Sequence, residues 1–271
     1  MQLLRKALEG QTYVPLDAAA LEMAAIEHPG IDPAPSLIIL DRIASELDAR
    51  VPAASDGREF VRTANQYLFD ELGFRGNEAN YYDPQNSCLD TVLDRRAGIP
   101  ITLSVVYIEV ARRMRRPVQG VGLPGHFIVQ FDDGDYSTYI DPFHGGKLLD
   151  VEDCRRRARE IAGVELARDD PALAVVGTRY ILVRMLNNLR SAYFRAREYA
   201  KCGPIMDLLI EAFPSNAEYY KLRGIARLQL RHFSGASRDL EMYLRNDPSA
   251  ADRVQITEQL EMIHRWLGRL N

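Results

Sequence analysis

Cysteine is scarce in this chain of 271 residues, which contains three: Cys88, Cys154 and Cys202. The three lie far apart and form no CxxC pair, so the sequence indicates neither a zinc site nor a disulfide framework. Such sparse cysteine is typical of proteins in a reducing compartment, and we expect a cytoplasmic protein.

Long apolar runs and an excess of basic residues are also absent. No run approaches the roughly 18 apolar residues of a membrane span. The N-terminal stretch MQLLRKALEGQTYVPLD carries charges where a signal peptide would be apolar. A net charge of −4 and a pI near 5.8 argue against non-specific binding to DNA or anionic membranes. We therefore expect neither a nucleic-acid partner nor a membrane partner, whereas 46% hydrophobic residues suffice for a packed core.

Residues 1–75 are predicted to form an N-terminal helical region. Apolar residues recur at three- and four-residue steps in three segments, which are 16–27, 36–47 and 56–72. The next segment, a loop followed by a helix, contains Cys88 on the helix, where a small, partly buried thiol is the expected role.

Residues 98–146 combine a helix with two strands. Ile99-Pro100 begins the helix, because proline is favoured in the first turn, and Pro117 ends it. Residues 118–131 are predicted to form a strand that is interrupted at 123–125. The acidic segment 132–135 has the composition of a turn, and residues 136–140 form the returning strand.

This hairpin predicts a contact between a histidine and an aspartate. If Phe131 lies opposite Tyr136, an unbulged turn also places His126 directly opposite Asp141. A carboxylate there could hold the imidazole in one tautomer and stabilise its protonated form, as a general base requires. Histidines paired with carboxylates are also common outside active sites, so a purely structural pair is the alternative.

Three further side chains belong to the candidate site. His144 follows Asp141 closely, and two histidines with a carboxylate are suitable metal ligands. A histidine–carboxylate pair needs no metal, however, and we predict neither a metal nor a cofactor. Tyr82 and Asn86 could line a cleft beside His126, although capping and packing would account for them equally well.

The C-terminal part of the chain contains a repeat. Residues 148–166 form a polar, Arg-rich segment that is predicted to be a solvated helix, and residues 169–171 mark a boundary. Beyond it, Phe213-Pro214-Ser215 returns as Asp247-Pro248-Ser249, with the two prolines 34 residues apart. This is the period of tetratricopeptide repeats, so residues 172–271 are predicted to be an all-α repeat domain.

Three segments carry a resemblance to a known family: NYYDPQNSCLDTVLDRRAGIPITLSVVYIEVARR, GVGLPGHFIVQF and YIDPFHGG. They resemble the bacterial SirB-type proteins, which join a transglutaminase-like domain to tetratricopeptide repeats. The resemblance implies an α+β fold with a papain/transglutaminase-like core at residues 76–168. It also implies that His126 and Asp141 occupy the positions of a Cys-His-Asp triad, whose cysteine would fall near residues 100–102.

No cysteine stands at that position, and Thr102 and Ser104 are the hydroxyl residues within reach. Two functions follow. The favoured one is a module, without the usual catalytic cysteine, that binds a protein or peptide through its repeats. The alternative is a degenerate cysteine-protease-like enzyme, an acyl or amide hydrolase or transamidase. In that enzyme His126 is the base, Asp141 orients it, and Thr102 or Ser104 is the nucleophile.

Overall fold

The computed structural model describes residues 1–11, 13–52 and 54–268, so the last three residues of the predicted repeat domain lie outside it. The chain forms two compact units, Met1–Met185 and Leu186–Asn271. The predicted helical region and the predicted core therefore share one unit, which also contains the first residues of the predicted repeat domain. No helix in the described part of the chain has both the length and the apolar character that crossing a bilayer requires.

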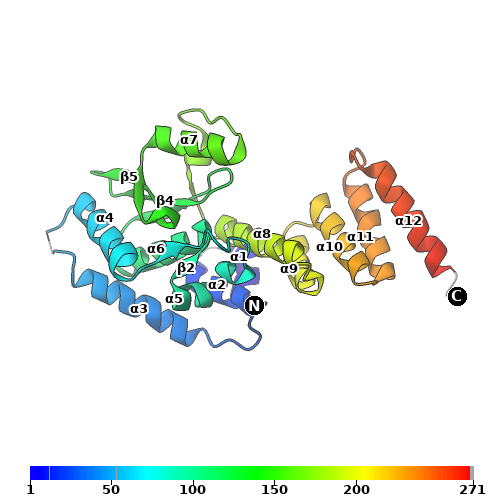
Figure 1. Cartoon of the computed structure of the whole chain (residues 1–271), viewed down its shortest axis with the longest axis horizontal. Coiled ribbons are helices and arrows are strands. Elements are labelled where there is room, and N and C mark those ends of the chain that lie inside the picture. The colour runs from blue at the N-terminus through cyan, green and yellow to red at the C-terminus, as the bar shows by residue number, and fades with distance from the viewer. Residues whose placement is uncertain (12, 53, 269–271) are drawn as a thin grey trace. The chain divides into compact units, whose positions relative to one another are not determined.

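The first unit consists of helices and short strands, which Figure 1 labels. Its α-helices are α1 (Gln2–Leu8), α2 (Leu16–Ala24), α3 (Ala34–Asp48), α4 (Gly57–Asn65), α5 (Leu89–Arg95), α6 (Pro100–Arg113), α7 (Val151–Ala162) and the first part of α8 (Thr178–Ala196). Its strands are β1 (Arg75–Gly76), β2 (Ala97–Gly98), β3 (Val118–Val121), β4 (Ile128–Asp132), β5 (Ser137–Asp141), β6 (Lys147–Leu149) and β7 (Val175–Val176). Short helical turns are η1 (Gln66–Glu71), η2 (Pro84–Ser87), η3 (Pro142–His144) and η4 (Pro171–Leu173).

Helix α6 lies at the centre of this unit. Every residue from Pro100 to Ala111 is buried, because the helix is apolar on nearly all sides. Its first turn is held by Thr102, whose Oγ1 accepts a hydrogen bond from the Ile99 N–H at 3.2 Å. The three helices predicted in residues 1–75 are confirmed as α2, α3 and α4. The third is shorter than predicted, because the segment 56–72 forms α4 followed by the π-helical turn η1.

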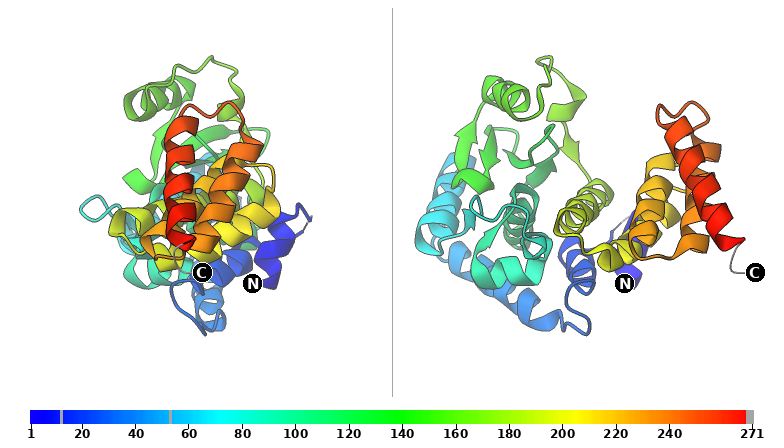
Figure 2. Two further views of the ribbon diagram at one scale, coloured as in Figure 1. Left: turned by 90° about the vertical axis from the view of Figure 1, so that its right-hand side faces the viewer. Right: turned by 45° about the vertical axis from the view of Figure 1, so that its right-hand side comes forward.

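An antiparallel sheet with strand order β6-β5-β4-β3-β7 lies between α6 and α7 (Figures 1 and 2). The face towards α7 is packed by Val121, Ile128 and Leu149 from the sheet and by Cys154 and Ala158 from the helix. The prediction of one solvated helix over 148–166 is therefore wrong. Part of the segment forms β6, and α7 is amphipathic, with a buried apolar stripe.

The predicted hairpin register is also wrong, by two residues. Phe131 pairs with Thr138 and Asp132 with Ser137, so Tyr136 lies in the turn. The Asp133 side chain closes this turn by accepting hydrogen bonds from the N–H groups of Asp135 and Tyr136. Because side chains alternate with a period of two, a two-residue shift leaves every side chain on its predicted face.

The second unit contains the rest of α8 and the helices α9 (Tyr199–Ala212), α10 (Ala217–Gln229), α11 (Phe233–Asn246) and α12 (Arg253–Leu267). Its core includes Tyr220, Leu240, Tyr243, Ile256 and Leu260. Helices α10 and α11 pack closely because Gly224 faces Leu240, where an added Cβ would lie 3.0 Å from the leucine side chain.

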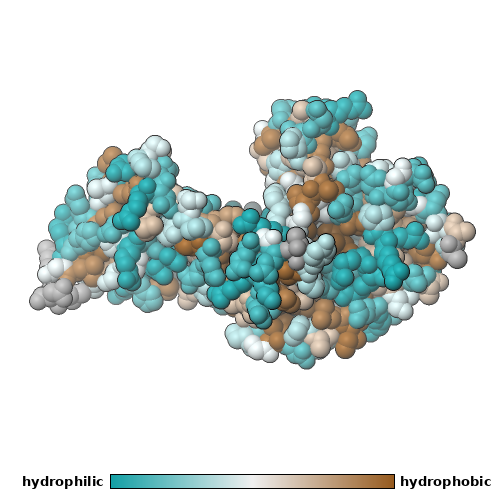
Figure 3. Space-filling model, turned by 180° about the vertical axis from the view of Figure 1, so that it is seen from behind, coloured by the Kyte–Doolittle hydropathy of each residue, from teal (hydrophilic) through white to brown (hydrophobic). Residues whose placement is uncertain are grey.

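Polar residues cover much of the molecular surface seen from behind, and apolar residues gather in a hollow beneath α7 (Figure 3). Exposed apolar side chains of the first unit include Ile161, Val175 and Tyr180.

Replacing Leu240 by alanine is expected to destabilise the second unit by about 2–5 kcal/mol, because the leucine is fully buried and the change leaves a cavity. Urea denaturation followed by circular dichroism measures the effect. Val254→Ala, at a side chain that is 73% exposed, is the matched control and should change stability by less than about 0.5 kcal/mol. Equal effects of the two variants would contradict the packing described for α10 and α11.

Candidate functional site

Asp141 is the centre of the candidate site. Its side chain is fully buried at the end of β5, and its Oδ2 lies 2.9 Å from His126 Nε2, 2.9 Å from His144 Nδ1 and 3.0 Å from Arg157 Nη1. Its Oδ1 accepts hydrogen bonds from the N–H groups of Phe143 and His144, so the same carboxylate caps η3. Burial raises the pKa of Asp141, but the hydrogen bond with His126 and the nearby positive charges outweigh it, and the net pKa is lowered.

His126 is presented by a tight turn before β4. Its N–H donates to the Leu123 carbonyl, and Gly125 in this turn has a φ of +72°. An added Cβ at Gly125 would also lie 2.6 Å from Ile161. From α8, Arg184 Nη2 donates to the carbonyls of Leu123 at 2.8 Å and His126 at 2.6 Å. The turn that carries the imidazole is therefore held from both sides.

The contact predicted between His126 and Asp141 is confirmed, although its geometry differs from the prediction. The observed register places Asp141 across from Ile128, so His126 reaches it diagonally along the same face of the sheet. The His126 side chain is 4% exposed, and its Nδ1 makes no hydrogen bond to any residue within the described ranges. One ring nitrogen is therefore held by the carboxylate and the other is available to a further group.

Arg157 is a site residue that the sequence reasoning missed. It lies on α7 with 16% of its side chain exposed, and its Nη1 is 3.0 Å from both Asp141 Oδ2 and His144 Nδ1. The nitrogen and oxygen donors of His126, Asp141 and His144 lie within 4.8 Å of one another, which suits a metal ion in distance. The guanidinium group already supplies a positive charge to this cluster. The absence of a metal and of a cofactor stays a prediction.

The two candidate hydroxyls lie on α6, on the other side of the sheet from α7. The Thr102 hydroxyl lies 2.8 Å from the carbonyl oxygen of Asn86 and 3.1 Å from that of Ile99, and it donates its hydrogen to these backbone acceptors. Ser104 is fully buried, and its Oγ has no hydrogen-bond partner among the described residues. The Asp141 side chain is on the face of the sheet that is turned towards α7, because Tyr139, two residues earlier in β5, packs on that face. The carboxylate and the two hydroxyls therefore lie on opposite sides of the sheet. Neither hydroxyl forms a hydrogen bond with the imidazole.

The remaining predicted residues belong to the loop before α5. Asn86 holds this loop together, since its Nδ2 donates to the carbonyls of Asn80 and Tyr81 and its Oδ1 accepts from Asn77. Tyr82 is 54% exposed. Its neighbour Tyr81, which the sequence did not single out, packs its ring against Phe143.

Phe143 in turn links this loop to the imidazole. The ring centroids of Tyr81 and Phe143 are 5.9 Å apart, and those of Phe143 and His126 are 6.1 Å apart. Cys88 was predicted on a helix but is the N-cap residue of α5, fully buried.

Comparison with known proteins identifies both parts of the chain. Residues 36–187 match the transglutaminase-like superfamily, and residues 189–261 match the tetratricopeptide repeat. The predicted α+β core followed by an all-α repeat module is thereby confirmed.

Three relatives illustrate the similarity. A UPF0162 protein of Xylella fastidiosa is 41% identical over 240 residues, which cover 87% of this chain and 85% of the relative. A UPF0162 protein of Pseudomonas aeruginosa is 31% identical, covering 93% of this chain and 89% of the relative. The human F-box only protein 21 is 32% identical over 171 residues, covering 59% of this chain and 26% of that protein.

Replacing Asp141 by asparagine is expected to cost about 3–5 kcal/mol at pH 7, because Arg157 loses its buried carboxylate partner. The pKa of Asp141 is lowered by folding, so its stabilisation is complete above the ordinary carboxyl pKa and is lost as the pH falls below about 4. The difference in unfolding free energy between wild type and Asp141→Asn should therefore shrink in acid.

Chemical denaturation at a series of pH values measures this difference. Asp135→Asn, in the exposed turn, is the matched control and should show no such trend. A wild-type advantage that is independent of pH would refute the assignment of Asp141 as a buried ionised carboxylate.

Proposed function

Because this chain belongs to the transglutaminase-like superfamily, we propose that it is a protein- or peptide-binding module whose transglutaminase-like domain has lost the usual nucleophile. The repeats hold the partner, and the first domain has a regulatory role. The finer likeness to SirB-type proteins and a cytoplasmic location are parts of this proposal.

The environment of the hydroxyls and thiols is the observation that carries the proposal. Residues 100–102 contain no cysteine, and the Thr102 hydroxyl is used to fix the start of α6. Burial raises the pKa of Cys154 to about 12 and that of Cys202 to about 11, so both remain thiols near neutral pH. Cys88 is fully buried as well. These surroundings favour binding over thiol catalysis.

The repeat helices supply a rigid surface for binding. Asp239 is buried between α10 and α11, where Arg223 contacts both of its carboxylate oxygens and Arg227 donates to Oδ2 at 2.7 Å. A second ion pair joins Arg223 to Asp207 of α9. These contacts fix three successive helices, and stacked helical repeats of this kind offer extended surfaces to a partner.

Peptides selected from a random display library on the full chain are expected to protect backbone amides within residues 186–271, as measured by hydrogen–deuterium exchange. His126→Ala should leave their affinity within about twofold, because the repeats hold the peptide and the buried His126–Asp141 pair does not contact it. Protection confined to the His126 turn and β3–β5 would overturn the proposal and place recognition in the first unit.

An acyl or amide hydrolase or transamidase is the second candidate. It is favoured by the His126–Asp141 pair and by His126 Nδ1, which has no hydrogen-bond partner among the described residues. The Ser104 hydroxyl is also without a partner there, but it is fully buried on α6.

We expect a fluorophosphonate probe to leave Ser104 and Thr102 unmodified in the native protein, because neither hydroxyl contacts the imidazole. Intact-mass and peptide mass spectrometry detect the adduct. Stoichiometric labelling of either residue that His126→Ala abolishes, while Asp135→Asn does not, would establish the enzyme and exclude the binding-only function.

A further inference from the structure

A cavity lies in the first unit, apart from the residues around Asp141. It has a volume of about 400 Å³, which is within the range of small-ligand pockets. The segment before α2, the second half of α6, β3 and the start of α8 form its walls. Apolar side chains dominate the lining, and they are Val14, Leu16, Ile108, Val118, Val176 and Ile181.

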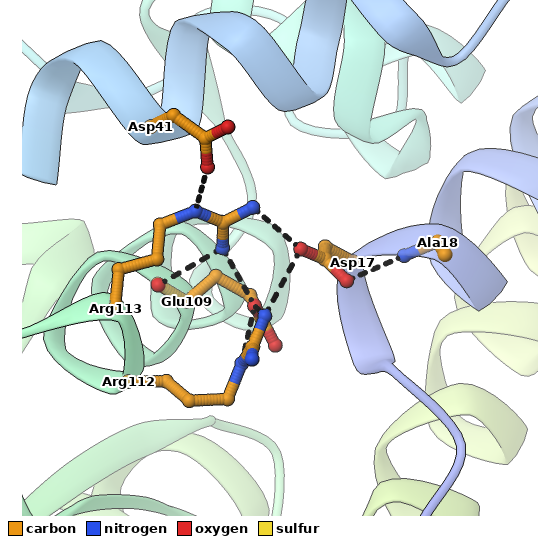
Figure 4. A network of polar contacts seen from close by, with 6 residues as sticks. All are labelled: Asp17, Ala18, Asp41, Glu109, Arg112 and Arg113. Atoms are coloured by element: carbon orange, nitrogen blue, oxygen red, sulfur yellow. Dashed lines mark hydrogen bonds and ion pairs between the residues drawn. The ribbon is translucent and has the colours of Figure 1, made fainter. Parts of the chain in front are cut away.

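Glu109 is the acidic group in this lining. Its side chain is 1% exposed, and its Oε2 accepts hydrogen bonds from Arg112 Nη2 at 2.6 Å and from Arg113 Nη1 at 2.9 Å. Its Oε1 is buried and has no hydrogen-bond partner among the described residues. In Figure 4 the dashed lines reach only one of the two carboxylate oxygens. A buried carboxylate oxygen without a donor is costly, so this atom is suited to accept one.

The charges around Glu109 do not balance. Arg113 pairs with Asp17 at 2.7 Å and with Asp41 at 2.6 Å, and Arg112 also reaches Asp17 (Figure 4). Three carboxylates therefore share two guanidinium groups, which leaves a formal charge of −1, although the Asp41 side chain is 68% exposed and is largely screened by water. Burial and the nearby Asp17 raise the pKa of Glu109, and the hydrogen bond from Arg112 opposes this only in part. A further positive charge beside Oε1 would complete the network.

We propose that this cavity binds a primary ammonium group on an aliphatic stem. The ammonium donates to Oε1 of Glu109, and the stem packs against Leu16, Ile108 and Ile181. The ligand is either a free alkylamine or a lysine side chain, because both present this chemistry. The site lies outside the His126–Asp141 pair and the repeats, so it is independent of the function proposed above.

Binding of n-hexylamine and of its neutral counterpart n-hexanol to the full chain, measured by isothermal titration and by NMR shifts, tests the proposal. The alcohol can also donate to Oε1, but only the ammonium brings a positive charge, and charge-assisted hydrogen bonds are roughly twice as strong as neutral ones. The amine should therefore bind about tenfold more tightly or better. Glu109→Gln should abolish this preference, and Glu258→Gln, at an exposed position on α12, should retain it.

A second variant tests the cavity without altering the ion pairs. Val176→Trp, on the short edge strand β7, should fill the cavity and block both ligands while leaving the melting temperature near that of wild type. Binding of Nα-acetyl-lysine methylamide would identify a lysine side chain as the source, and binding of the alkylamine alone would identify a small amine.

Three results would overturn the proposal. They are equal affinity for amine and alcohol, an amine preference that survives in a folded Glu109→Gln variant, and unchanged binding by Val176→Trp. If Glu109→Gln does not fold, the amine–alcohol comparison in wild type and the Val176→Trp result decide together.

Discussion

A single buried carboxylate, that of Asp141, holds together the part of the first unit that contains His126. Asp141 joins three elements that are distant in sequence, because the His126 turn, η3 and α7 all place a donor on it. Isolated charges are rarely buried, since removing a carboxylate from water is expensive unless several donors replace the water. Five contacts do so here, which explains why a full negative charge is tolerated between the sheet and α7.

This arrangement has a consequence for chemistry. A catalytic aspartate in a triad orients its histidine towards a nucleophile, whereas Asp141 also faces the guanidinium of Arg157. The positive charge competes with the imidazole for the same oxygen, Oδ2. The His126–Asp141 pair therefore has contacts that would suit a structural role as well as contacts that would suit a general base. A structural role is consistent with the lack of a cysteine at the start of α6.

Local patterns predicted much of the fold, and contacts across the chain were harder to predict. Helix α6 was recognised because its apolar residues and Pro100 are local signals. Strand β6 was missed because three residues are too few to show alternation. The hairpin shifted by two residues because the Asp133 side chain closes the turn at Tyr136, a choice that composition alone did not specify.

In the candidate site, too, local patterns were predictable and contacts between distant segments were not. His126 and Asp141 could be paired from the sequence, since alternation along two strands is a local property that tolerates a two-residue error. Arg157 could not, because it stands in a run of arginines and only the packing of α7 selects it. Tyr81 and Tyr82 are adjacent, and only the fold distinguishes the one that reaches Phe143.

The three cysteines lie in different parts of the chain, and each is fully buried. Cys88 caps α5, Cys154 packs between α7 and the sheet, and Cys202 lies among the repeat helices. Alkylation at each sulfur thus requires the local structure around it to open. The native chain therefore contains three intrinsic reporters of local opening: one at α5, one between α7 and the sheet, and one among the repeat helices. Their separate modification rates would show which of these regions opens most readily.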